Sequence, residues 1–260
     1  MTDPREHVHY NFGGECQPGD IAPYVLLPTA VHQVEKAVAD MENARKLTHH
    51  YEFLVYTGEY AGVPLSVCST GMGGMSVSIA IEELARLGAR TFLQVGLAEP
   101  LPDEPPTGGL MIAKGAARFD GTSHDYVRPE FPALAHFEVV MAAIAAAEHL
   151  HQAYRVGIVA SLASAPRSRE DGAQMVHSIL DERTKPMRDA IRQAGVQGGS
   201  GEEATVLVQS AIYGFRAGAI SARPDGEDSL IATGLETIRV LGEWDRRKAE
   251  EKVPYTVPRV

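Results

Sequence analysis

The sequence predicts a single α/β domain in which a mixed, mostly parallel central sheet is flanked by helices on both faces. The chain has 260 residues, of which 44% are hydrophobic and 22% charged, so it is long enough to bury one large core. From residue 21 onward, short apolar runs alternate with stretches of helical spacing. This alternation is typical of a parallel sheet covered by helices. Because no stretch resembles a linker, we expect one domain over residues 1–252 and an irregular arm, which contains two prolines, over 253–260.

The individual elements follow in chain order from hydrophobic periodicity and from the residues that break it. Short apolar runs bounded by glycine, proline or polar residues predict strands at 24–27, 53–56, 64–69, 91–96, 109–114, 154–161 and 217–222. The strands at 53–56 and 64–69 form a pair joined by a turn at Ala61 and Gly62. Longer stretches with apolar residues three to four positions apart predict helices at 31–41, 75–87, 132–150, 170–180, 183–194, 202–215 and 228–251. Residues 195–201 are predicted to form a loop.

Charge and cysteine content exclude several classes of function. The formal net charge of −10 opposes binding to nucleic acids and to anionic membranes. The N-terminus has no apolar signal sequence, and no apolar stretch reaches the length of a membrane span. Two cysteines, Cys16 and Cys68, do not make a disulfide framework, so a reducing compartment is expected. We therefore expect a cytoplasmic protein that binds a small molecule and needs neither a metal nor a cofactor.

The strongest local motif is a strand, a glycine-rich turn and a helix at residues 68–84. The unpaired N–H groups of a helix N-terminus hold anions or polar ligands, and glycines let a ligand approach the backbone. Gly71, Gly73 and Gly74 have neither Walker nor dinucleotide-binding spacing. The glycine spacing by itself favours a tight turn without a ligand.

The full string Ser69-Thr70-Gly71-Met72-Gly73-Gly74-Met75-Ser76 resembles the signature of the nucleoside phosphorylase family, specifically its uridine-phosphorylase-like branch. A second stretch, residues 118–123 followed by 129–133, is similar to the same branch, and the order of elements from residue 24 to 243 agrees. The resemblance implies the nucleoside phosphorylase fold, substrate contacts at Gly71, Met72 and Gly73, and a homo-oligomer, either a dimer with shared sites or a hexamer. In that family phosphate attacks the anomeric carbon of a nucleoside and the free base leaves.

The resemblance also implies that the phosphate site has changed. It places the family's three phosphate-binding arginines at Gln33, at Tyr51 (lent to a neighbouring subunit) and at Gln94. After Gly96 the family has two hydroxyl residues and a glycine, where this chain has Leu97-Ala98-Glu99. Three lost charge-assisted hydrogen bonds cost on the order of 5–9 kcal/mol if they add. Even half of that weakens phosphate binding by about two thousandfold. We therefore expect that phosphate is not a substrate.

The sugar side of the site is partly retained in the resemblance. Glu202 matches the glutamate that holds the ribose hydroxyls, with Glu203 beside it, and Gly201 replaces a methionine. His9 is similar to a histidine that the family lends across a subunit interface to the ribose 5′-hydroxyl. Taken alone, Glu202 is an acidic residue in the first turn of a helix, which needs no function.

The base side is altered. The loop over 162–171 has no aromatic residue, and Arg167 or Arg169 could bind a carboxylate or carbonyl, although exposed loop charges are common. Arg223, after the last strand, matches the arginine of uridine-type members, whereas Ala222 replaces the acid of purine-specific members.

Three hypotheses follow. In the first, the site performs acid–base chemistry without phosphate on a small metabolite, by isomerisation, cyclisation or N-glycoside hydrolysis, in specialised metabolism. In the second, the protein is a uridine or purine nucleoside phosphorylase with a rebuilt anion site. In the third, it is a non-catalytic binding paralogue. The first hypothesis assigns catalysis to Glu99 and Glu202, and substrate binding to His9, Tyr51, Gly71, Met72, Gly73, Gln94, Gly96, Arg169, Glu203 and Arg223.

Overall fold

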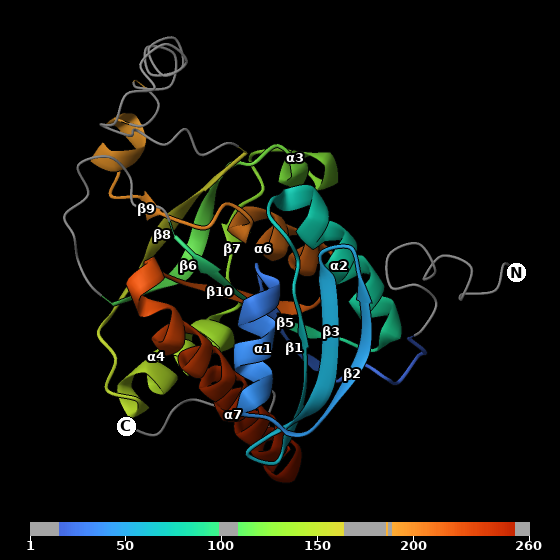
Figure 1. Cartoon of the computed structure of the whole chain (residues 1–260). Coiled ribbons are helices and arrows are strands. Elements are labelled where there is room, and N and C mark those ends of the chain that lie inside the picture. Colours follow the sequence, from blue (N-terminus) through green and yellow to red (C-terminus); the bar gives the residue numbers. More distant parts are fainter. Residues whose placement is uncertain (1–15, 99–108, 164–185, 187–188, 253–260) are drawn as a thin grey trace, which may run out of the picture.

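The computed structural model describes residues 16–98, 109–163, 186 and 189–252. Several predicted features lie outside these residues: His9, Glu99, Arg167 and Arg169, the helix expected at 170–180, most of the helix expected at 183–194, and the arm over 253–260. The predicted α/β class is confirmed, since one sheet runs through the molecule and helices pack on both of its faces (Figure 1).

The sheet has ten strands in the order β2-β3-β4-β1-β5-β10-β6-β8-β9, with β7 paired to β6. Its strands are β1 (Tyr24–Pro28), β2 (Glu42–His50), β3 (Phe53–Tyr60), β4 (Val63–Cys68), β5 (Thr91–Leu97), β6 (Leu110–Phe119), β7 (Ala133–Leu134), β8 (Tyr154–Leu162), β9 (Gln197–Gly198) and β10 (Arg216–Ala222). The four central strands β4, β1, β5 and β10 are mutually parallel. Their carboxyl ends therefore meet at one edge of the sheet, which is where open α/β sheets bind ligands.

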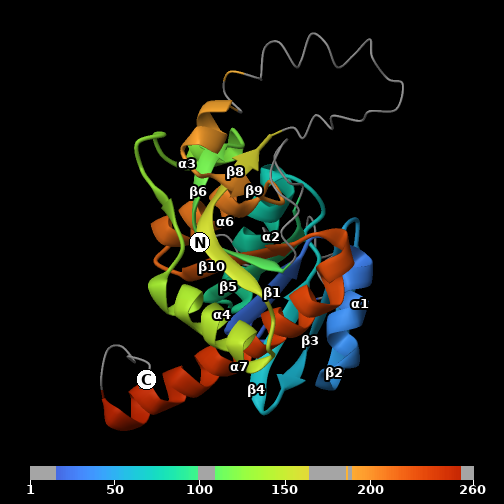
Figure 2. The same cartoon turned by 90° about the vertical axis from the view of Figure 1, so that its left-hand side faces the viewer.

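Side chains that alternate along the central strands divide the core into two layers. On one face Val25, Leu27 and Phe92 pack against α2 (Gly74–Leu87) and α6 (Glu203–Ile212). On the other face Leu26 and Leu93 pack against three further helices, which are α1 (Val31–Ala39), α4 (Phe137–His149) and α7 (Glu227–Glu251). Figure 2 shows α7 running along this second face beside α4. The first layer holds the candidate site, because Gln94 follows Phe92 by two residues and therefore faces α6.

The structure corrects several predicted boundaries. β2 was not predicted, because it is mostly exposed and polar and so carries no hydrophobic alternation, although it pairs with β3 along its length. The helix predicted at 132–150 begins only at Phe137, because Ala133 and Leu134 pair with Ala116 and Gly115 of β6. The predicted loop over 195–201 contains the short strand β9, and α3 (Thr122–Tyr126) was also not predicted. In the described part of the chain no helix is both long and apolar enough to cross a membrane.

Candidate active site

Polar residues follow the central strands where their carboxyl ends meet. Thr29 follows β1, Ser69 and Thr70 follow β4, and Gln94 lies in the middle of β5, paired with Leu27 near the end of β1. The backbone N–H groups of Thr70 and Gly71 donate to the carbonyls of Pro28 and Thr29 at 3.0 Å each. These bonds hold the glycine turn against the end of β1, so the turn and the strand ends form one surface.

The glycine turn is fixed by backbone conformations and close contacts that only glycine permits. Gly71 and Gly73 have φ angles of +68° and +98°, in the region that favours glycine. A Cβ on Gly74 would lie 2.6 Å from Oγ1 of Thr205 and 2.7 Å from Oγ1 of Thr122. The start of α2 therefore packs directly on α6 and α3, which explains why the motif requires a glycine pair.

Glu202 directly precedes α6, and its side chain contacts the glycine turn. Its side chain is buried, and Oε1 accepts a hydrogen bond of 2.8 Å from the N–H of Gly73, whereas Oε2 has no hydrogen-bond partner. Burial raises the pKa of Glu202 to about 7, the charge of Glu203 raises it further, and the Gly73 N–H opposes the shift. A carboxyl group with a pKa near neutrality both accepts and donates protons under ordinary conditions. Glu202 thus has the properties of a general acid–base.

Glu203 is committed to the loop before α6. Its Oε1 accepts from the N–H of Ser200 at 2.5 Å and lies 3.0 Å from the Ser200 hydroxyl, and its Oε2 accepts from the N–H of Gly201 at 2.9 Å. The pKa of Glu203 is raised by burial, an effect that these hydrogen bonds oppose. Both oxygens of Glu203 therefore hold the loop before α6, and its expected contact with a substrate stays a prediction.

The Ser200 hydroxyl joins this loop to the sheet. Nε2 of Gln94 donates to Oγ of Ser200 at 2.7 Å, and the buried Oε1 of Gln94 has no hydrogen-bond partner. A Cβ on Gly96 would lie 2.6 Å from Cβ of Ser200, so the close approach of loop and strand requires glycine there. Ser200 was not among the predicted site residues, although its position directly before Gly201 and Glu202 is a signal that could have marked it.

Gln33 and Tyr51, two of the three positions where the family has a phosphate-binding arginine, make no hydrogen bond with Gln94, Ser200 or Glu202 in the structure. Gln33 is buried, and its side chain is held by two neighbours: its Oε1 accepts from the N–H of Ala30 and its Nε2 donates to Glu227, each at 3.0 Å. Tyr51 is 73% exposed in the turn between β2 and β3, with a φ angle of +52°. Gln33 therefore joins α1 to α7, and Tyr51 is free to contact another molecule.

The structure brings Gly71, Met72, Gly73, Gln94, Gly96, Glu202 and Glu203 together at one edge of the sheet. Arg223 directly follows β10 at the same edge, but its charged contact is a 3.9 Å approach to Asp225. In the described part of the chain, no lysine or arginine makes a hydrogen bond or ion pair with Gln94, Ser200, Glu202 or Glu203. Among these four residues, the ionisable groups are thus the carboxyls of Glu202 and Glu203.

The stretch around Arg118 has a structural role. The guanidinium of Arg118 donates to the backbone carbonyls of Ser123, Val127, Arg128 and Phe131 at 2.6–2.8 Å. Asp120 accepts from the hydroxyls of Ser123 and Thr205 at 2.6 and 2.5 Å. These bonds tie the segment after β6 to α6, so this motif supports the helix that carries Glu202 and does not itself add a cation to the site.

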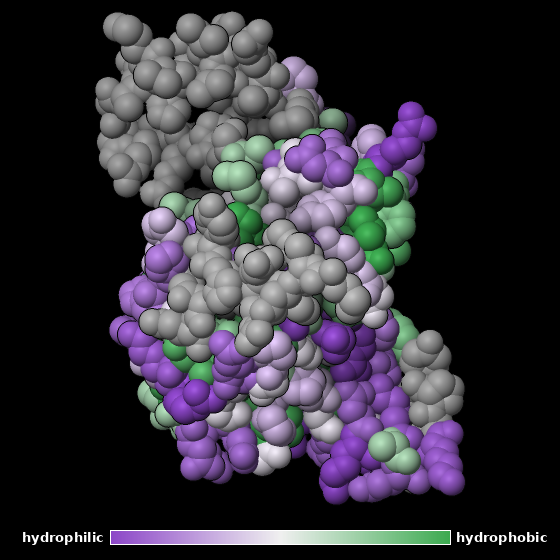
Figure 3. Space-filling model, turned by 90° about the vertical axis from the view of Figure 1, so that its right-hand side faces the viewer, coloured by the Kyte–Doolittle hydropathy of each residue, from purple (hydrophilic) through white to green (hydrophobic). Residues whose placement is uncertain are grey.

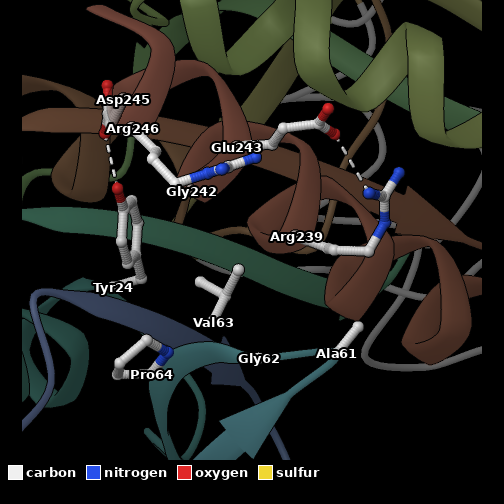
Figure 4. Close-up of a pocket in the computed structure, with 10 residues that line it drawn as sticks. All are labelled: Tyr24, Ala61, Gly62, Val63, Pro64, Arg239, Gly242, Glu243, Asp245 and Arg246. Carbon is white, nitrogen blue, oxygen red and sulfur yellow. Dashed lines mark hydrogen bonds and ion pairs between the residues drawn. The ribbon is translucent and has the colours of Figure 1, made fainter. Parts of the chain in front are cut away.

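A separate cavity of about 520 Å³ lies at the opposite end of β1, between the β3–β4 turn and α7 (Figure 4). Polar side chains that line it have partners within the chain, because Tyr24 donates to Asp245 at 2.5 Å and Arg239 pairs with Glu243 at 3.2 Å. Tyr24 begins β1 and Thr29 follows it, so this cavity is ~16 Å along the strand from the candidate site. No cluster of three potential metal ligands occurs among the described residues.

Comparisons with known proteins identify the family of this chain. The sequence profile of the phosphorylase superfamily matches residues 23–229. Uridine phosphorylase of Thermococcus kodakarensis is 40% identical over 243 residues, which cover 90% of this chain and 87% of that protein. Uridine phosphorylase of Treponema pallidum is 34% identical, over 89% of this chain and 87% of its own length. Guanosine phosphorylase of Halorubrum lacusprofundi is 30% identical, over 78% of each chain.

Proposed function

The chain belongs to the phosphorylase superfamily as a nucleoside phosphorylase-like protein, and on that premise we propose that it is an enzyme that performs acid–base chemistry on a nucleoside or related sugar-containing metabolite without phosphate. One observation carries this proposal. Glu202, with a pKa of about 7, lies beside a neutral Gln94–Ser200 pair, and no described cation contacts this group.

The absence of a phosphate role rests on electrostatics. A phosphate dianion at this edge would approach the carboxyl groups of Glu202 and Glu203, and like charges at close range repel strongly where water is excluded. The turn offers backbone N–H groups, but that of Gly73 already donates to Glu202. Without guanidinium groups, these donors do not compensate the cost of removing phosphate from water.

Glu202 acts as the general acid–base in this proposal, and the reaction classes are isomerisation, cyclisation and N-glycoside hydrolysis. In hydrolysis, water would add to the anomeric carbon, the N-glycosidic bond would break, and the base would leave with a proton. Glu99 is proposed as a second catalytic group on the sequence resemblance alone, as are His9 and Arg169 for substrate binding.

The test is incubation of the purified protein with uridine, guanosine and adenosine, in buffers with and without inorganic phosphate, followed by chromatography of the products. Phosphate-independent conversion, whether to free base and sugar or to an isomer, supports the proposal. Base release that occurs only with phosphate, together with formation of sugar 1-phosphate, would overturn it.

That second outcome would establish the alternative function, a nucleoside phosphorylase with a rebuilt anion site. The names of the relatives favour it, because three proteins that are 30–40% identical are uridine or guanosine phosphorylases. The two functions differ in the nucleophile, so the dependence on phosphate separates them directly.

We also propose that the protein forms a homo-oligomer through the region around Tyr51. Met72 and Met75 are 87% and 72% exposed. They adjoin this turn, because Glu52 contacts Gly71 and accepts from the Ser76 hydroxyl at 2.6 Å. Figure 3 shows the side of the molecule that lies on the right in Figure 1, where a few hydrophobic side chains lie among mostly hydrophilic ones. Sedimentation of the wild type and of Met75→Asp tests this proposal: a dimer or larger species should become smaller in the variant.

A further inference from the structure

Three buried polar atoms at the carboxyl edge of the sheet have no hydrogen-bond partner: Oγ1 of Thr29, Oε1 of Gln94 and Oε2 of Glu202. Gln94 and Glu202 are 1% and 2% exposed. A buried polar atom without a partner is costly, and a ligand that supplies the missing hydrogen bond removes this cost. The carbonyl oxygen of Gln94 can only accept hydrogen bonds, and Oε2 of Glu202 can only accept them once the carboxyl group is ionised. All three atoms belong to residues at the candidate site.

The orientation of the Gln94 amide is set by its neighbours. The N–H of Ser200 donates to Oε1 of Glu203, which makes this oxygen an acceptor and leaves the Ser200 hydroxyl to donate its hydrogen to a carboxyl group. Oγ of Ser200 therefore accepts from Gln94, and the group placed there must be the amide nitrogen at 2.7 Å. The carbonyl oxygen of Gln94 is then the end of the amide that remains without a partner.

The electrostatics favour the same type of ligand. Glu202 and Glu203 are adjacent buried carboxyl groups, and their mutual charge is one cause of the raised pKa of Glu202. A ligand that brings hydrogen-bond donors, and above all a positive charge, lowers the electrostatic energy of this pair, whereas an anion raises it.

Resting on the proposed function, we infer that Gln94 determines the specificity of this site, and that its carbonyl oxygen together with Oε2 of Glu202 selects a ligand bearing hydroxyl or amine donors over an anion. Ser200 is the positioning residue, since it holds the amide with its oxygen toward the ligand.

The test measures the dissociation constants of three probes by NMR titration: D-ribose, 1-amino-1-deoxy-D-ribitol and inorganic phosphate. The wild type should bind at least one of the two donor probes about tenfold or more tightly than phosphate, the difference expected from about one hydrogen bond to a buried group. In Ser200→Ala the amide is free to turn its NH₂ toward the ligand, so the donor-to-phosphate ratio should fall about tenfold, and Ser200→Thr should restore it. Gln94→Arg should reverse the preference.

The amine probe separates the two donor chemistries. If the ligand carries an ammonium group, its binding should strengthen more steeply than that of ribose as the pH rises through 7 and Glu202 ionises, because a charge–charge attraction is then added to the hydrogen bond. The matched control is Gln209→Met, because Gln209 is also buried, donates to the carbonyl of Ser78 at 3.0 Å and has a free Oε1, but lies two turns along α6. This control should leave the ratio unchanged, whereas Gln94→Met should lower it.

A wild type that binds phosphate as tightly as the donor probes, or that binds neither donor probe, overturns the inference. So does a ratio that stays constant in Ser200→Ala and Gln94→Met. These outcomes are distinct from failure of the proposed function, which is decided by phosphate-dependent base release from the wild type.

Discussion

The backbone N–H of Gly73 donates a hydrogen bond of 2.8 Å to Oε1 of Glu202, a residue 129 positions later in the chain. This bond joins the glycine turn after β4 to the start of α6. It also orients the carboxyl group so that its second oxygen remains without a partner. The donor is a neutral N–H group. It therefore stabilises the carboxylate less than a positively charged side chain would, and the pKa of Glu202 stays raised.

Replacing Glu202 by Gln should reduce kcat at least a hundredfold on any substrate that the wild type converts, because an amide has the same shape but does not transfer the proton. The measurement is steady-state kinetics, with Glu35→Gln, an exposed residue of α1, as the matched control. In the wild type the pH profile of kcat should show an inflection near the pKa of Glu202, about 7. Retention of full activity in Glu202→Gln would remove this carboxyl group from the mechanism.

The same group should make stability depend on pH. Burial raises the pKa of Glu202 from 4.5 to about 7, so the folded state holds the proton more tightly than the unfolded state. The resulting stabilisation is fully present below pH 4.5 and is lost as the pH rises to about 7, by on the order of 3 kcal/mol. The free energy of unfolding of the wild type, relative to Glu202→Gln, should therefore fall between pH 5 and 7.5. Urea denaturation across this range checks it, and a constant difference would contradict the raised pKa.

Gly96→Ala should separate the strand from the loop that carries Ser200. The new Cβ would lie 2.6 Å from Cβ of Ser200 and 2.8 Å from Nε2 of Gln94. We expect a loss of stability of about 1–3 kcal/mol from this overpacking, together with weaker ligand binding. Gly226→Ala is the control, since its Cβ would meet a single methyl group at 3.3 Å. If the two substitutions had equal effects on denaturation and binding, the close contact between Gly96 and Ser200 would not be the cause of these losses.

Arg216→Met should destabilise the fold without involving the site. Arg216 pairs with Asp245 at 2.5 Å and with the buried Glu138 at 3.1 Å, at the opposite end of β10 from Arg223. Removing one partner from a largely buried charge network costs about 3 kcal/mol. Arg86→Met, which breaks the exposed pair with Glu82, should cost less than about 1 kcal/mol. Chemical denaturation of both variants tests the contrast, and similar losses would argue against the network.

Gln33→Leu should lower stability and leave ligand selectivity intact. The side chain of Gln33 accepts from the N–H of Ala30 and donates to Glu227, so its loss removes a helix cap and a link between α1 and α7, worth about 1–2 kcal/mol. Thermal unfolding and the probe titrations described above measure the two effects. A changed donor-to-phosphate ratio would place Gln33 in the binding site after all.

The sequence by itself predicted much of the architecture. Fully buried parallel strands appear as short apolar runs, and this is why β1, β5 and β10 were found close to their true bounds. The string from Ser69 to Ser76 carried the family resemblance, because its glycines meet steric demands that few other sequences satisfy. β2 was missed, since a strand with an exposed, polar surface has no hydrophobic period.

Only the tertiary structure decided which polar residues meet. The sequence treated Gln33 and Gln94 alike, as two places where an arginine is missing, yet the first faces Glu227 and the second faces Ser200. Likewise, Glu202 and Glu203 are neighbours in the chain, but one has a free oxygen and the other has both oxygens bound. The physical reason is that hydrogen-bond partners and the loss of water are set by contacts between distant segments, and these fix the pKa of a carboxyl group and the orientation of an amide.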